Sequence, residues 1–148
     1  MRAYRLEEPA HAIGPEDLAR QGVLSWSVPD DEAGRAAMID AIKREHGYVD
    51  EDFVELGPAT PNLEAICAKF DKEHYHSEDE VRFVVEGDGI FDVRDEGHDR
   101  WIRIEVSRGD MIVIPAHKYH RFTLSDSRQI RCMRLFANHD GWAPLYRV

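Results

Sequence analysis

The stretch "HYHSEDEVRFVVEG" (residues 74–87) places two histidines and a glutamate close together at the start of a β-like run. In a helix, residues two apart point in nearly opposite directions, so His74 and His76 could not reach one ion. In a strand they share a face. A strand continued straight to Glu80 would put its carboxylate about 13 Å further along. We therefore expect the chain to turn through "SED" and to bring Glu80 back beside the histidines on a returning strand.

The sequence beyond residue 73 has the period-two pattern of short β-strands. Turn-rich segments separate the apolar runs: "EGDG", "DEGHD", "SRGD" and "SDS". The runs between them are "EVRFVV", "IFDV", "WIRIEV", "MIVI", "HRFTL" and "QIRCMRLF". This spacing predicts an antiparallel β-barrel or sandwich over about residues 73–137.

The N-terminal half has a helical pattern instead. "DDEAGRAAMIDAIKREHG" (residues 30–47) begins with acidic residues, ends with basic ones and has Gly47 where a C-cap belongs. "PNLEAICAKF" (residues 61–70) places apolar residues at helical spacing. No Pro-, Gly- or Ser-rich linker divides the halves. We expect a helical part over about residues 1–72 that packs on the barrel within a single domain, residues 1–148.

Composition limits the partners. A chain of 148 residues with 43% hydrophobic and 32% charged residues has the composition of one globular domain. Its formal net charge of -10 opposes binding to nucleic acid and to anionic membranes. Its start lacks the apolar core of a signal peptide, and no apolar run is long enough to span a bilayer. The two cysteines form no CxxC motif. We expect a cytoplasmic protein, with a nuclear pool left open for a eukaryotic chain.

A fourth metal ligand is offered by "PAHKYHRF", where His120 stands at the start of a β-run after a proline turn. Three imidazoles and a carboxylate leave about two positions of an octahedral ion open, as in the two-histidine, one-carboxylate iron enzymes. His117 is the alternative ligand or a hydrogen-bond donor, but a histidine exposed in the turn is the favoured interpretation. The remaining histidines have no partner at metal spacing and are expected to be ordinary surface or hydrogen-bonded residues: His11, His46, His98 and His139.

These motifs resemble those of the cupin superfamily. "HYHSEDEVRFVVEG" is similar to its first motif, and "GDMIVIPAHKYH" to its second. More narrowly, the chain resembles the acireductone dioxygenase family from about Leu18 onward. The segments that carry this resemblance are "GVLSW", "EHYHSEDEVRFVVEGDGIFDVRD", "WIRIEVSRGDMIVIPA", "YHRFTL" and "MRLF". The resemblance implies a cupin-type antiparallel β-barrel (a double-stranded β-helix, or jelly roll) with helices packed against it.

The resemblance also implies roles for individual residues. Its four metal ligands correspond to His74, His76, Glu80 and His120. Arg82, two residues beyond Glu80, would hold an anionic substrate as a catalytic and binding residue; the alternative is a surface arginine. Phe70 and Phe122 would line the substrate pocket, although Phe70 also completes an apolar helix stripe. Asp79 would accept a proton or orient a ligand, or serve only as an exposed turn carboxylate.

The activity implied is oxygenation of an acireductone, a dihydroxy-keto-methylthiopentene, by O₂ in methionine salvage, with one Fe(II) or Ni(II) ion per chain. In that family Fe(II) gives formate and the methylthio keto acid, whereas Ni(II) gives formate, CO and methylthiopropionate. The salvage role favours iron, and we expect a monomer. The alternatives are another cupin dioxygenase or isomerase acting on a small enediol, and a non-catalytic cupin binding module stabilised by metal. His117 and Lys118 depart from the family pattern and leave substrate preference open.

Overall fold

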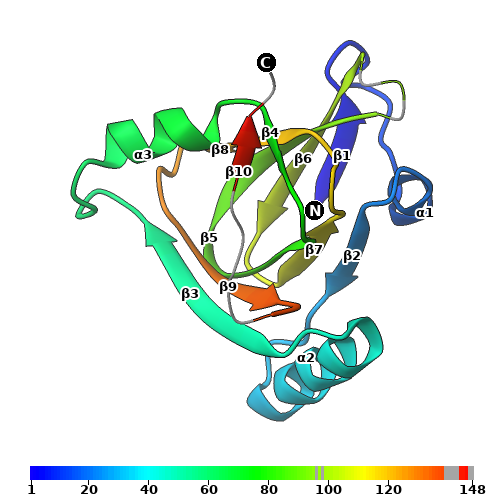
Figure 1. Cartoon of the computed structure of the whole chain (residues 1–148), viewed down its shortest axis with the longest axis vertical. Coiled ribbons are helices and arrows are strands. Elements are labelled where there is room, and N and C mark those ends of the chain that lie inside the picture. The colour runs from blue at the N-terminus through cyan, green and yellow to red at the C-terminus, as the bar shows by residue number, and fades with distance from the viewer. Residues whose placement is uncertain (96, 98, 139–143, 147–148) are drawn as a thin grey trace.

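The computed structural model describes residues 1–95, 97, 99–138 and 144–146, and its architecture is mainly β (Figure 1). The helices are α1 (Pro15–Arg20), α2 (Glu32–His46) and α3 (Leu63–Phe70). The strands are β1 (Arg2–Arg5), β2 (Leu24–Ser27), β3 (Asp50–Leu56), β4 (His74–His76), β5 (Glu80–Arg94), β6 (Trp101–Ser107), β7 (Asp110–Ile114), β8 (His120–Leu124), β9 (Ile130–Phe136) and β10 (Pro144–Tyr146). These strands pair antiparallel in one curled sheet with helices against it, which confirms the predicted fold class.

Strand β5 organises the sheet. Its first half pairs with β7 and β9, and its second half pairs with β6 and β8. The sequence pattern predicts two strands separated by a turn at "EGDG", and this prediction is wrong. The chain passes through these residues as one strand with an irregularity between Val84 and Glu86. Gly87 has φ +79°, and a Cβ there would lie 2.2 Å from the carbonyl oxygen of Gln129, so the position requires glycine.

The irregularity in β5 changes which residues face the barrel interior. Before it, the even-numbered Glu80 and Arg82 line the interior cavity. After it, the odd-numbered Phe91 and Val93 belong to the interior core. One extra residue in a strand reverses the facing of every residue that follows, because side chains alternate with a period of two. The same strand therefore supplies polar groups to the cavity and apolar groups to the core.

A second core lies between the barrel and α2. Alternate residues of β5, such as Val81 and Phe83, pack in this outer cluster with Ile39 and Ile42 of α2. Burial on both faces explains the continuous apolar run "FVV", which does not alternate with polar residues.

The N-terminal half is only partly helical, so the expected helical part over residues 1–72 is corrected. Both predicted helices are present, and Gly47 is the left-handed C-cap of α2, with φ 75°. However, β1, β2 and β3 also lie in this half and pair with β6, β7 and β9 respectively. Strand β3 was missed because four of its seven residues are acidic, in the sequence "DEDFVEL", and acidic residues have low β-propensity.

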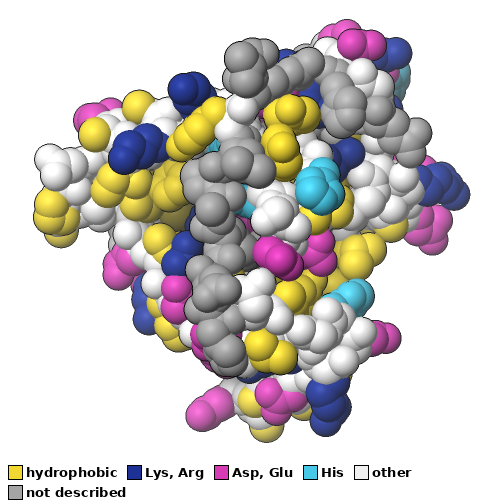
Figure 2. Space-filling view, in the orientation of Figure 1, with side chains coloured by type: hydrophobic (Ala, Val, Ile, Leu, Met, Phe, Trp, Pro, Cys, Tyr) yellow, Lys and Arg dark blue, Asp and Glu magenta, His cyan; other side chains and the backbone are white. Residues whose placement is uncertain are grey.

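Two elements bound the mouth of the barrel near the site. Helix α3 lies beside β8 and has no fully buried residue, and Figure 2 shows hydrophobic side chains gathered over this end of the molecule. Strand β10 pairs with β4 and lies beyond the predicted barrel limit of residue 137. Within the described ranges, no helix is long and apolar enough to cross a membrane.

Candidate metal centre

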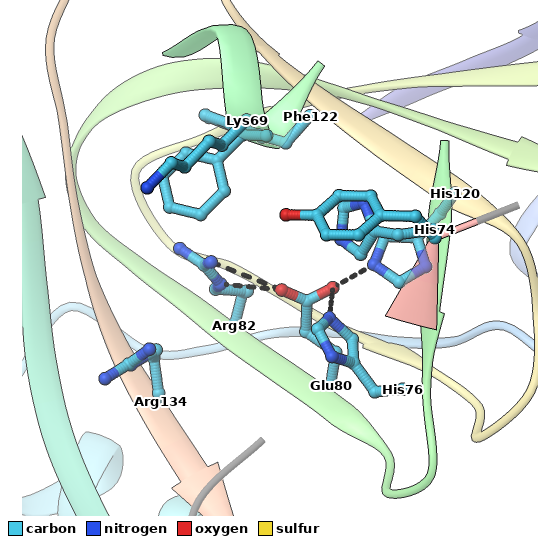
Figure 3. A pocket seen from close by; sticks show the side chains of 10 residues that line it. Lys69, His74, His76, Glu80, Arg82, His120, Phe122 and Arg134 are labelled. Carbon is cyan, nitrogen blue, oxygen red and sulfur yellow. Dashed lines mark hydrogen bonds and ion pairs between the residues drawn. The ribbon is translucent and has the colours of Figure 1, made fainter. Parts of the chain in front are cut away.

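Three histidines meet inside the barrel (Figure 3). His74 and His76 lie on β4, and His120 is the first residue of β8, directly opposite His74 in the strand register. All three are buried, and each offers a ring nitrogen within 4.8 Å of the others. The predicted strand geometry is therefore confirmed for the imidazoles, since alternate residues of β4 point to the same side.

Glu80 joins the histidines after the predicted turn through residues 77–79. Its Oε2 atom lies 2.6 Å from Nε2 of His120 and 3.9 Å from Nε2 of His76. The side chain of Arg82 is buried as well, and it donates from Nε and Nη2 to Oε1 of Glu80 at 3.3 and 3.2 Å. One carboxylate oxygen thus faces the imidazoles while the other is held by the guanidinium.

Backbone carbonyls fix the orientation of two imidazoles. Nδ1 of His74 lies 2.6 Å from the carbonyl oxygen of Lys72, and Nδ1 of His120 lies 2.9 Å from that of Lys118. A carbonyl oxygen can only accept, so each Nδ1 must carry the hydrogen. In the neutral rings, Nε2 then has the lone pair that a metal ion requires.

The charges of the site suit a cation. Burial, followed by the proximity of His120, lowers the pKa of His74, so its ring is neutral at neutral pH. Burial by itself would raise the pKa of Glu80, but His120, Arg82 and His76 outweigh it and hold that pKa well below its usual range. The site therefore presents an ionised carboxylate and a neutral imidazole, which are the protonation states that bind metal.

Two buried atoms test whether a metal fits. Within the part of the chain that the structure describes, Oε2 of Glu80 and Nε2 of His120 are buried and make no hydrogen bond. The two atoms lie 2.6 Å apart without hydrogen-bond geometry, so neither satisfies the other. An unsatisfied buried polar atom costs about 1–3 kcal/mol, and a divalent ion would satisfy both. Three imidazole nitrogens and one carboxylate oxygen suit Fe(II), Ni(II) or Zn(II).

A cavity of about 170 Å³ adjoins these groups. The described residues that line it are Lys69, Phe70, His74, His76, Glu80, Arg82, His120, Phe122, Arg134 and Tyr146. The structure therefore places Arg82, Phe70 and Phe122 in the pocket as the resemblance implies. The two phenylalanine rings meet edge to face, with centroids 6.2 Å apart.

Three lining residues were missed from the sequence. Arg134 lies on β9 opposite Arg82, a proximity that only the strand register reveals. Lys69 belongs to the exposed residues of α3, and only the position of that helix at the mouth brings it to the cavity. Tyr146 lies on β10, outside the predicted barrel. Lys69 and Tyr146 carried no motif or spacing signal, and Arg134 lies in the "MRLF" segment of the family resemblance but was assigned no role.

Asp79 is placed differently from its expected role. Its Oδ2 atom accepts a hydrogen bond from the hydroxyl of Tyr48 at 3.0 Å, and its Oδ1 atom accepts one from the backbone nitrogen of Ala116 at 3.0 Å. It is absent from the described residues that line the cavity. The carboxylate thus ties the turn after β4 to the loop before β8, so its role as a proton acceptor receives no support from this geometry.

The other histidines lie outside the cluster where they are described. His117 is exposed in a left-handed turn conformation, with φ 68°, and its backbone nitrogen donates to the carbonyl oxygen of His76 at 2.8 Å. This confirms the turn interpretation. His11 is exposed, and His46 stacks on Tyr48. His98 and His139 lie outside the described residues.

Replacing Asp79 with asparagine distinguishes a structural role of this carboxylate in the turn from a catalytic role as proton acceptor. We expect Asp79→Asn to lower the free energy of unfolding by about 1–2 kcal/mol, because a charge-assisted bond to Tyr48 is weakened. A catalytic proton acceptor would instead cost about 10²–10⁴-fold in kcat. Denaturant unfolding measures the free energy of unfolding, and steady-state kinetics measure kcat. Glu78→Gln, on the same turn, is the control. A kcat loss above about 100-fold at unchanged stability would restore the catalytic role.

The curled antiparallel barrel with a three-histidine, one-carboxylate cluster in its interior defines a metal-binding cupin. The model of the ARD/ARD' family matches residues 2–144, and the chain belongs to this family. It is 48% identical over 149 residues to the acireductone dioxygenase of Heterostelium pallidum, covering 99% of this chain and 98% of the relative. It is 42% identical over 140 residues to acireductone dioxygenase 1 of Physcomitrium patens, covering 94% and 72% respectively.

A solved structure agrees with the fold. The acireductone dioxygenase of Bacillus anthracis, described with a cadmium ion in its active centre, superposes with a TM-score of 0.85 at 30% identity. The match covers 98% of this chain and 97% of that one. This agreement confirms the cupin architecture expected from the sequence.

Proposed function

We propose that this chain is a metal-dependent acireductone dioxygenase that cleaves its substrate with O₂ in methionine salvage. Family membership and the names of the relatives support the activity. The observation that carries the proposal is the buried set of three imidazoles and one carboxylate beside a small cavity. The proposed ligands of one metal ion per chain are His74, His76, Glu80 and His120. All four come from one chain, so the site would be complete in a monomer, which we propose as the active unit.

Cationic side chains in the cavity would bind the acidic end of an acireductone. Arg82 and Lys69 line the same space as the proposed ligands. Arg134 lines it too, but its guanidinium donates to both carboxylate oxygens of Asp52. Positive charge favours the deprotonated form of an enediol, because a nearby opposite charge lowers the pKa of an acid. Arg82 also holds Oε1 of Glu80, so the same guanidinium would orient the ligand and stabilise the substrate's negative charge.

Aromatic side chains would bind the other end of the substrate. Phe70 and Phe122 form an edge-to-face pair in the cavity wall. Apolar burial favours a methylthio tail over a polar one, and sulfur contacts with aromatic rings are favourable. The cavity thus has a charged region and an apolar region, which match the two ends of an acireductone.

The bound divalent metal would supply the Lewis-acid and redox chemistry that the side chains lack. The ligand set suits both Fe(II) and Ni(II), so it does not decide between them. We propose Fe(II) as the resident ion because of the role of the enzyme in methionine salvage. Reconstitution with each ion checks the consequence. We expect formate and the methylthio keto acid from the Fe(II) protein, and CO with formate and methylthiopropionate from the Ni(II) protein. Metal analysis of natively purified protein identifies the resident ion, and a nickel-only preparation would contradict the iron assignment.

A spectroscopic assay tests the activity itself. Anaerobic addition of an acireductone to metal-loaded protein should shift the ultraviolet band of the substrate, and O₂ should then consume it with release of formate. Metal-free protein is the matched control. Binding without turnover would indicate another substrate, and no spectral change would favour a metal-stabilised binding module.

A further inference from the structure

The C-terminal strand brings a tyrosine to the metal centre. Strand β10 pairs antiparallel with β4, and Tyr146 stands directly opposite His74 in the register. Side chains of directly opposed residues project to the same face of a sheet. The two ring centroids are 5.8 Å apart, and Tyr146 lines the cavity. Its side chain therefore forms part of the wall next to a proposed ligand.

Lys72 holds both members of this pair. Its ammonium nitrogen lies 4.7 Å from the centroid of the Tyr146 ring, a cation–π contact, and its carbonyl oxygen accepts the hydrogen of Nδ1 of His74. Lys72 thus orients the imidazole through its backbone and the phenol ring through its side chain. The pairing of β10 with β4 places the ring beside His74, and Lys72 contacts both side chains there.

Partial exposure places the tyrosine at the boundary between cavity and solvent. Tyr146 is 38% exposed although it lines a cavity whose other aromatic residues, Phe70 and Phe122, are more enclosed. Among the described residues its hydroxyl has no hydrogen-bond partner, so the ring makes the contacts that position this side chain. A ring at this boundary can pack on a bound molecule and narrow the route for water.

We propose that Tyr146 is a substrate-binding residue of the active site, whose ring packs against the bound acireductone and is held in place by Lys72. This inference rests on the proposed function and extends the site to the C-terminal strand. The ring, and not the hydroxyl, is the required group. Removal of the ring weakens substrate binding and leaves the proposed metal ligands in place.

Anaerobic substrate titration of metal-loaded variants tests this assignment. For Tyr146→Ala we expect the dissociation constant of the acireductone to rise about 10-fold, the scale of one aromatic contact, with KM rising in parallel. Tyr146→Phe should stay within about 2-fold of wild type. Lys72→Met, which keeps the carbonyl, should raise the dissociation constant about 2–5-fold, as expected for an exposed cation–π contact. Phe53→Ala removes an exposed aromatic side chain on β3 and serves as the control.

Metal content and thermal unfolding of each variant separate binding from folding. Tyr146→Ala should retain wild-type metal per chain, and weaker substrate binding at equal metal content supports the proposal. If Tyr146→Ala binds the substrate as wild type does, the inference is overturned while the proposed function stands. If Tyr146→Phe is as weak as Tyr146→Ala, the hydroxyl is required and the inference is overturned. If wild-type protein binds no acireductone, both the proposed function and the inference fail.

Discussion

Replacing Glu80 with glutamine is expected to abolish turnover and to lower metal affinity by more than about 100-fold. Even a substitution of a residue that only orients a metal ligand lowers metal affinity or activity by about 10–100-fold. Glu80 is the single anionic group proposed to contact the ion. Glutamine keeps the shape and still accepts from Arg82 at Oε1. The loss would therefore come from charge and ligand strength and not from collapse of the turn.

Metal analysis of purified Glu80→Gln protein checks this expectation, with Glu78→Gln as the matched control. Glu78 lies in the adjacent turn, so its variant should retain wild-type metal and activity. Full iron or nickel occupancy in Glu80→Gln would remove Glu80 from the ligand set. Circular dichroism of both variants separates the loss of a ligand from the loss of the fold.

Arg82→Met should reduce kcat/KM by about 10²–10³-fold, the usual effect of removing one electrostatic contact to a developing charge. The same change deprives the buried carboxylate of Glu80 of its guanidinium. Removal of one partner of a buried ion pair typically costs about 3–5 kcal/mol. We therefore expect a large loss of stability in the metal-free protein and a smaller loss in the metal-loaded protein, where the ion compensates the carboxylate.

The pH dependence of unfolding provides the second measurement for Arg82→Met. Glu80 has a lowered pKa in the folded protein, so it contributes stability above the ordinary carboxyl pKa and loses it as the pH falls to the lowered value. Without Arg82 the pKa of Glu80 should rise, so metal-free Arg82→Met should lose stability at a higher pH than wild type. Arg82→Lys keeps a positive charge without the two-pronged contact. It should lose stability at a pH between those of wild type and Arg82→Met. Wild-type kinetics in Arg82→Met would exclude a role in catalysis.

Three of the candidate ligands, His74, His76 and Glu80, could be predicted because their spacing converges on one ion only in a strand followed by a turn. His74 and His76 share a face in a strand and not in a helix, and Glu80 reaches them only after a turn. The structure has that turn and that convergence. Predictions based on local spacing and period therefore hold for this part of the site.

Other parts of the site depend on contacts between distant segments. Arg134 reaches the cavity through the pairing of β9 with β5, and Tyr146 through the pairing of β10 with β4. Asp79 has a suitable residue type and position for proton transfer, but its carboxylate accepts a hydrogen bond from Tyr48, which lies on a distant segment. Period and composition do not encode such pairings, and the same limitation led to the wrong division of β5 into two strands.

The irregularity between Val84 and Glu86 has a consequence for how the barrel tolerates length changes. Removal of a single residue there would put the two ends of β5 out of phase with their present neighbours. If the later half kept its place, Glu80 and Arg82 would turn towards α2, while Val81 and Phe83 would turn towards the three imidazoles. One residue therefore decides whether the polar or the apolar face of β5 points into the cavity. Insertions or deletions at that point should be far more disruptive than substitutions.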